Sequence, residues 1–138
     1  LGCGSGILAI AAAKLGFRPV TALDCDPDAV RIAHENAAHN GVAGQIRFLV
    51  ADLADFAPGA SFDVVAANLL APLLLAQADR MAGLVVAADT AALILSGILD
   101  SQYPEVRDAY RRRGFSEYRS RAIAEWKSAW LARRAGAL

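Results

Sequence analysis

The order of apolar and polar residues along the chain predicts an alternation of strands and helices. Short β-type apolar runs predict strands, whereas apolar residues spaced by three and four predict helices. We expect strands over residues 19–23, 46–50, 62–67, 91–96, 115–121 and 124–132. We expect helices over residues 7–15, 27–40, 72–81 and 102–113. The alternation over the first hundred residues is typical of an α/β fold with a parallel sheet, which the last two strands close as an antiparallel pair.

The second predicted helix has the plainest boundary signals. Asp26 is a favourable N-cap, Pro27 suits the first helical position, and Gly41 is a favourable stop. Its histidines, His34 and His39, are five residues apart and do not share the helix face that a metal pair requires. We therefore expect both at the surface and predict no metal site. Buried faces are predicted at Val30, Ala33 and Ala37, and on the last helix at Val106, Ala109 and Tyr110.

Length and composition indicate one domain. The 138 residues suffice for a single domain, 1–138, with a real core. Uncharged runs stop short of the roughly twenty residues that a membrane helix needs, so we expect no membrane association. The two cysteines form no Cys-x-x-Cys pair, which favours a reduced, cytoplasmic setting. Because the chain has no initiator methionine, we expect it to be a fragment of a longer protein.

The net charge is zero but unevenly distributed. Residues 1–100 hold five basic and ten acidic side chains, whereas residues 101–138 hold nine basic and four acidic ones. A basic end suggests RNA or an acidic partner. However, no aromatic residues interleave with Arg111, Arg112 and Arg113 as a stacking surface for bases requires. We favour a solvated surface and expect no direct nucleic-acid binding.

The first six residues form the clearest candidate ligand site. Gly2, Gly4 and Gly6 allow a tight turn and a close backbone approach to a ligand, and the following helix would present its free amides there. A dinucleotide fingerprint needs a small residue where this chain has Ile7, which argues against NAD. A G-x-G-x-G loop with an acid, Asp24, some way downstream resembles instead the class I S-adenosylmethionine (SAM) methyltransferases. A glycine-rich turn without a ligand is the alternative.

Two acidic residues end predicted parallel strands, where such sheets bind their ligands. Asp24 can accept hydrogen bonds from both ribose hydroxyls of a nucleoside; the alternative is a helix cap, a role that Asp26 fills better. Asp52 can accept from the exocyclic amine of an adenine, with Leu53 against the ring. A turn-forming aspartate is the alternative for Asp52.

Two cysteines accompany these residues. Cys3 lies inside the glycine loop and Cys25 follows Asp24, so both are expected near the cofactor. If both cysteines contact the cofactor, their alkylation would block SAM binding. As small packing residues, they would have no functional part.

Asn68, which follows the strand predicted over residues 62–67, is the candidate for chemistry. Methyl transfer from a sulfonium to an amine is an in-line displacement, so positioning carries most of the work. The amine must be neutral, and a lysine has a reference pKa of about 10.4, so desolvation would help release its proton. The Asn68 amide oxygen and the Leu69 carbonyl can hold the amine hydrogens and aim its lone pair at the methyl group. A capping asparagine is the alternative.

Several stretches carry a resemblance to one family. They are residues 2–11, 24–30, 35–37, 40–42, 62–73, 95–99, 114–115 and 125–126. Together they span nearly the whole chain, which resembles the catalytic domain of the ribosomal protein L11 methyltransferase family. Many methyltransferases share the glycine loop. The stretch around Asn68 and the Ser-Gly-Ile-Leu stretch are more particular to this family.

The resemblance implies a Rossmann-like class I methyltransferase fold, with a mostly parallel seven-stranded sheet and an antiparallel C-terminal strand pair. It implies SAM as the methyl donor. It implies lysine side chains and the N-terminal amine of a large-subunit ribosomal protein as acceptors. By matching position, Gly2, Gly4 and Asp24 would bind the cofactor, and Asn68 would lie between the cofactor and the acceptor.

The chain departs from the family pattern in two places. The family's first strand, an acid before the glycine loop and an N-terminal substrate-recognition domain lie outside these residues. We therefore expect the fragment alone to fold poorly, because a missing central strand exposes ladder groups on its neighbours. Residues 87–90 replace a Pro-Gly-Gly-like turn, which affects the turn geometry rather than the chemistry.

Three other functions fit parts of the sequence. Methyltransferases acting on RNA or DNA base amines, or on glutamine amides, follow their strand-end Asn or Asp with two prolines and an aromatic. Here Leu69 and Leu70 follow Asn68, so no aromatic is placed to stack on a base, and the neutral net charge also argues against nucleic acid. A non-catalytic SAM-binding module would not need Asn68. An NAD oxidoreductase is disfavoured by Ile7.

Overall fold

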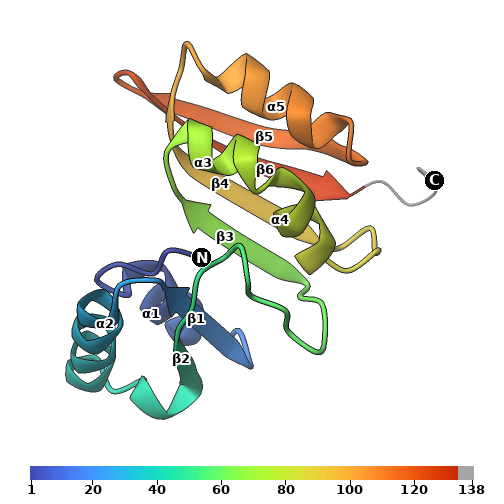
Figure 1. Ribbon diagram of the computed structural model, residues 1–138. Helices are drawn as coiled ribbons and strands as arrows, with labels where there is room; N and C mark the ends of the chain where they lie inside the picture. The colour runs from blue at the N-terminus through green and yellow to red at the C-terminus, as the bar shows by residue number, and fades with distance from the viewer. Residues whose placement is uncertain (134–138) are drawn as a thin grey trace. The chain divides into compact units, whose positions relative to one another are not determined.

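Residues 1–133 are described in the computed structural model, and they fall into two units (Figure 1). One unit comprises Leu1–Phe56 and the other begins at Ala57. None of the helices in the described residues has the length and apolar character needed to cross a membrane.

The first unit consists of two parallel strands with helices packed against them. Its elements are α1 (Ile7–Lys14), β1 (Val20–Asp24), α2 (Pro27–His39), the 3-10 helix η1 (Ala43–Gln45) and β2 (Ile46–Val50). Asp24 lies opposite Val50 in the parallel register, so the two strands end together. The predicted bounds of β2 are confirmed.

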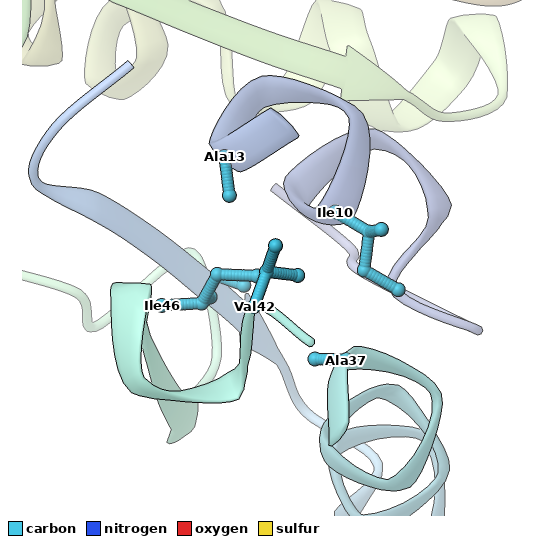
Figure 2. Close-up of a cluster of buried hydrophobic side chains, with 6 residues drawn as sticks. Ile10, Ala13, Ala37, Val42 and Ile46 are labelled. Atoms are coloured by element: carbon cyan, nitrogen blue, oxygen red, sulfur yellow. The ribbon is translucent and has the colours of Figure 1, made fainter. Parts of the chain in front are cut away.

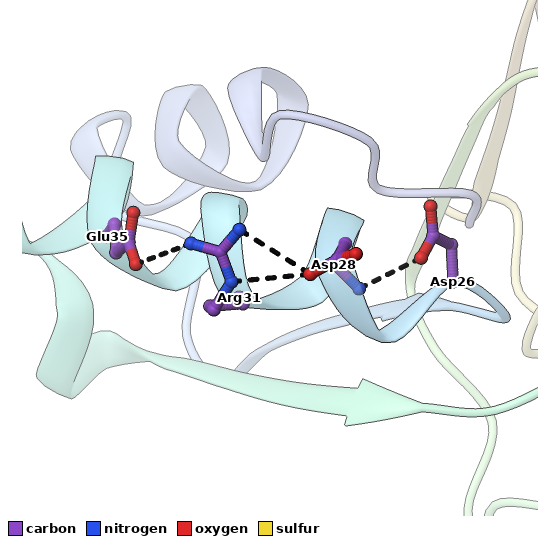
Figure 3. Close-up of polar contacts among 4 residues, drawn as sticks. All are labelled: Asp26, Asp28, Arg31 and Glu35. Carbon is purple, nitrogen blue, oxygen red and sulfur yellow. Dashed lines mark hydrogen bonds and ion pairs between the residues drawn. The ribbon is translucent and has the colours of Figure 1, made fainter.

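Helix α2 begins and ends where its sequence predicts. The Asp26 carboxylate accepts a 2.9 Å hydrogen bond from the backbone N–H of Asp28, and Gly41 follows the helix with φ 72°. Arg31 forms ion pairs with Asp28 and Glu35 along the solvent side (Figure 3). These side chains are largely exposed, so the ion pairs contribute little to stability. The predicted buried face is confirmed at Val30, Ala33 and Ala37.

The core of the first unit lies among α1, α2 and the two strands. Figure 2 shows its side chains pointing toward one another from these elements. The cluster consists of Ile10, Ala13, Ala22, Ala37, Val42 and Ile46. Its three alanines let the backbones approach closely, and the half-buried Cys3 and Phe48 pack against its edge.

The second unit is a four-stranded mixed sheet with three helices. Its elements are β3 (Val64–Asn68), α3 (Ala71–Ala76), α4 (Ala78–Leu84), β4 (Ala92–Leu99), α5 (Tyr103–Arg111), β5 (Phe115–Ile123) and β6 (Trp126–Arg133). The strand order is β3-β4-β6-β5, with β3 and β4 parallel and the remaining pairs antiparallel. The predicted antiparallel final pair is therefore confirmed. The three helices lie on one face of this sheet (Figure 1).

The core of the second unit is centred on Tyr110 of α5. Its hydroxyl donates a 3.0 Å hydrogen bond to the carbonyl of Leu74 and lies 3.2 Å from the sulfur of Met81. Burial in this apolar setting raises the pKa of the Tyr110 hydroxyl. The predicted burial of Val106, Ala109 and Tyr110 is confirmed.

The helix predicted over residues 72–81 is wrong as a single element. The helix is interrupted at Gln77, which separates α3 from α4. A continuous helix would pair the Leu74 carbonyl with the amide four residues later, but that carbonyl accepts from Tyr110 instead. The strand predicted from residue 62 begins at Val64, because Phe62 forms only an isolated bridge to Val85.

The described residues match the expected number of strands, because that expectation placed the first of the seven strands outside this chain. They form six strands in two sheets, one of two strands and one of four. The strand predicted to end at residue 96 continues to Leu99, because a bulge lets β4 keep pairing with β6.

Candidate functional site

The glycine loop has the backbone that its sequence predicts. Gly2, Gly4 and Gly6 have φ values of 61°, 50° and 85°, in the left-handed region that favours glycine. A Cβ on Gly6 would lie 2.9 Å from the Cβ of Ala33, closer than side chains pack. Only glycine therefore lets the loop lie this close to α2.

Asp24 ties the loop to the end of β1. Its carboxylate accepts hydrogen bonds from the backbone N–H of Gly4, at 2.9 Å, and of Asp26, at 3.1 Å. The predicted proximity of Asp24 to the loop is confirmed. Each carboxylate oxygen accepts only one of these bonds and keeps capacity for another donor, such as a ribose hydroxyl. The residues at this position thus fit the sugar of a nucleoside cofactor.

Asn36 is a loop-supporting residue that the sequence analysis did not single out. Its side-chain amide donates a 2.8 Å hydrogen bond to the carbonyl of Ser5, from α2 across to the loop. The only signal in the sequence was its place inside a matched stretch, residues 35–37.

Asp52 forms a local turn after β2. Its carboxylate accepts a 2.8 Å hydrogen bond from the N–H of Ala54, and its carbonyl accepts from Asp55 and Phe56. The turn-forming alternative is therefore present in the structure. Leu53 is buried. The adenine contacts of Asp52 and Leu53 stay a prediction.

The two cysteines have different surroundings. Cys3 is half-buried against the core of the first unit, whereas Cys25 is exposed. Burial, with a further contribution from the charge of Asp24, raises the pKa of the Cys3 thiol. The raised pKa of Cys3 is in keeping with a packing role. Cofactor contact by either cysteine stays a prediction.

In the second unit, Asn68 lies at the end of β3 and lines a pocket of about 660 Å³. The lining consists of Asn68, Leu69, Leu70, Leu73, Ser96, Gly97 and Trp126. None of these side chains is charged, and most are apolar. The pocket therefore offers an apolar surface with no charged partner for an ammonium group, and it is open to solvent at Leu70, which is 67% exposed.

Two oxygen acceptors converge beside Gly97 in this pocket. A Cβ built on Gly97 would lie 2.7 Å from the Asn68 Oδ1 and 2.9 Å from the Leu69 carbonyl oxygen. Both oxygens thus lie beside the bare Cα of Gly97 and close to each other. The sequence analysis singled out Asn68 and Leu69 for this role but treated Gly97 only as part of a matched stretch.

The described residues contain no group of three or more His, Cys, Asp or Glu side chains placed to hold a metal ion. His34 and His39 are both exposed, as predicted. His34 packs its ring edge-on against Phe48, and His39 contacts the carbonyl of Glu35 at 2.8 Å. Both contacts are local to the first unit.

Comparison with known proteins places these features in one class. A solved structure of ribosomal protein L11 methylase from Lactobacillus delbrueckii subsp. bulgaricus superposes with a TM-score of 0.81 at 34% identity, covering 96% of this chain and 67% of that one. An RNA methyltransferase from Salinibacter ruber, solved with S-adenosyl-L-homocysteine, gives 0.73 at 19% identity, covering 96% and 76%, and so shares the fold alone. The fold is that of the Rossmann-like methyltransferases.

The sequence narrows this class to a family. Residues 1–134 match the model of the ribosomal protein L11 methyltransferase (PrmA) family. The chain belongs to this family. It is 45% identical over 134 residues to the ribosomal protein L11 methyltransferase of Bradyrhizobium diazoefficiens, covering 95% of this chain and 45% of that protein. The chain thus spans under half the length of this curated relative.

Proposed function

We propose that the full-length protein transfers methyl groups from SAM to amino groups of ribosomal protein L11, namely lysine side chains and the N-terminal amine. Membership of the L11 methyltransferase family supports the substrate. The observation that carries the chemistry is the pair of oxygens, Asn68 Oδ1 and Leu69 O, which lie close together beside Gly97 in an uncharged pocket. This arrangement suits a neutral amine with two hydrogens to donate.

The first unit supplies most of the proposed cofactor contacts. When bound, SAM supplies a methyl group activated by its sulfonium sulfur. Asp24 would hold the ribose hydroxyls through the free capacity of its carboxylate, and the glycine loop would let the cofactor approach the backbone. The full proposed set is Gly2, Cys3, Gly4, Gly6, Asp24, Cys25, Asp52, Leu53 and Asn68.

The second unit supplies the proposed acceptor site. Asn68 and the Leu69 carbonyl would accept the two amine hydrogens, which leaves the nitrogen lone pair free and fixes its direction. Apolar neighbours, including Leu70 and Leu73, would disfavour the protonated amine. SAM would supply the methyl group to this nitrogen and leave as the neutral thioether, and the methylated ammonium would release its proton to water. A neutral substrate amine makes a charged base in this pocket unnecessary.

The proposal extends to the setting of the reaction. We place it in the cytoplasm, with residues 1–138 belonging to one catalytic domain and with the ribosomal protein as the partner. Membrane association and direct nucleic-acid binding form no part of the proposal.

Substitution of Asn68 tests the catalytic part of this proposal. In the full-length protein, Asn68→Ala should lower kcat on the order of a hundredfold, the size of effect of removing one preorganised polar group. SAM affinity, measured by calorimetry, should fall far less than kcat, because Asn68 is one of nine proposed cofactor residues. Asn40→Ala is the control, because Asn40 contacts only the carbonyl of Asn36 at the end of α2. Full turnover in Asn68→Ala would contradict the proposed role of Asn68, whereas SAM binding without any turnover in the unaltered protein would favour a module that only binds SAM.

A further inference from the structure

We propose that the bulge of β4, formed by Ser96 and Gly97, is a positioning element that aims the Asn68 amide oxygen and the Leu69 carbonyl at the acceptor amine. Ser128 of β6 holds this bulge in place. The inference rests on the proposed methyl transfer to amines. It assigns roles to residues that are not themselves proposed to react.

The register of the sheet defines the bulge. Between Leu95 and Ile98, the pairing of β4 with β6 shifts by one position. Ser96 and Gly97 therefore oppose a single residue, Ser128. Bulges of two residues against one redirect the local backbone and are frequent beside active sites. The bulge interrupts a β4–β6 ladder that is otherwise regular, so its presence calls for a functional explanation.

The bulge is joined directly to the end of β3. Asn68 lies opposite Ser96 in the parallel register, and the N–H of Leu69 donates a 3.1 Å hydrogen bond to the Ser96 carbonyl. The next residue, Gly97, has φ 79° and presents its bare Cα to the two acceptor oxygens. A side chain on Gly97 would occupy the space beside the Asn68 Oδ1 and the Leu69 oxygen, and would push both away.

Ser128 fixes the bulge from the opposite strand. Its Oγ lies 2.8 Å from the Oγ of Ser96, and both residues are half-buried. This hydrogen bond limits the freedom of Ser96, whose carbonyl in turn holds Leu69. A continuous series of contacts thus runs from Ser128 through Ser96 to the backbone N–H of Leu69, while Gly97 keeps the space beside Asn68 free.

The first test compares two glycine variants in the full-length protein. Gly97→Ala should lower kcat for L11 on the order of tenfold or more, because small misplacements of reacting groups are costly. Its SAM affinity should be unchanged. Gly41→Ala is the matched control: Gly41 also has a positive φ, 72°, but a Cβ there meets nothing within 4 Å. It reproduces the backbone strain without pressing on Asn68. Equal kcat in the two variants would overturn the inference.

A second pair of variants covers the case in which Gly97→Ala does not fold. Ser128→Ala removes the hydrogen bond to Ser96 and should lower kcat several-fold at constant SAM affinity. Ser128→Thr keeps a hydroxyl and should restore most of the rate. A merely structural role would lower stability and SAM affinity together, without rescue by threonine. Wild-type kcat in Ser128→Ala would overturn the inference.

The same assay separates this inference from the proposed function. An unaltered protein that transfers no methyl group to L11 overturns the proposed function, and the positioning role falls with it. If the unaltered protein is active, and Gly97→Ala and Ser128→Ala are as active as their controls, only the positioning role is overturned.

Discussion

The backbone N–H of Gly4 donates a 2.9 Å hydrogen bond to the carboxylate of Asp24, twenty positions away. This bond joins the middle of the glycine loop to the end of β1. A second bond, from the N–H of Asp26, holds the other carboxylate oxygen at 3.1 Å. Asp24 is therefore fixed in orientation before any ligand arrives, which lowers the entropic cost of binding.

Removal of the Asp24 carboxylate should weaken SAM binding. We expect Asp24→Ala to raise the SAM Kd by ten- to hundredfold, since hydrogen bonds to charged groups are worth about 1.5–3 kcal/mol. Calorimetric titration of the full-length protein measures this. Asp28→Ala is the control, because the Asp28 side chain is 78% exposed and pairs only with Arg31. An unchanged Kd in Asp24→Ala would remove Asp24 from the cofactor site.

The close contact of Gly6 with α2 predicts that a side chain at Gly6 lowers the stability of the protein more than one at Gly16. Gly16→Ala should lose about 1–3 kcal/mol of stability through its positive φ alone, since a Cβ there meets nothing within 4 Å. Gly6→Ala should lose about 1–3 kcal/mol more, because its Cβ would overlap that of Ala33. Denaturant unfolding of both variants measures the difference. Equal losses would contradict the tight packing of the loop on α2.

The ion pair between Arg113 and Asp79 predicts a pH dependence of stability. Arg113 donates two hydrogen bonds to this carboxylate, at 2.7 and 2.8 Å, and they lower the pKa of Asp79 below its ordinary 3.8. A carboxyl whose pKa is lower in the folded state stabilises the protein above its unfolded pKa. That contribution is lost as the pH falls through the folded pKa.

The Asp79→Asn substitution tests this pH dependence of stability. The variant should melt slightly below the unaltered protein at neutral pH, since Asp79 is 89% exposed and solvent weakens the pair. The difference should shrink below pH 3.8 and vanish below the folded-state pKa. Melting temperatures of both proteins, recorded from neutral to acidic pH, provide the comparison. A difference that persists unchanged in acid would show that the charge of Asp79 is not its cause.

Local sequence signals predicted the first unit well. The N-cap at Asp26, the stop at Gly41 and the bounds of β2 depend on residues within a few positions of each other, and all are confirmed. Alternating glycines and a strand-end Asp24 likewise indicated a contact that the structure contains. Such features need little information about distant parts of the chain.

Features set by distant residues were not predictable in this way. The break at Gln77 has no glycine or proline to indicate it, and it coincides with the hydrogen bond from the Tyr110 hydroxyl to the Leu74 carbonyl. The bulge at Gly97 depends on the register against Ser128, which no local pattern specifies. The sequence therefore indicated Asn68 as the residue for chemistry but did not reveal what holds its side chain in place.

The most direct test is transfer of a labelled methyl group from SAM by the full-length protein, offered purified ribosomal protein L11 and, separately, ribosomal RNA. We expect label in L11, on lysine side chains and on the N-terminal amine, and none in RNA. Label in RNA would contradict the choice of substrate and favour methylation of base amines. No label in either substrate, with SAM still bound, would contradict the proposed activity itself.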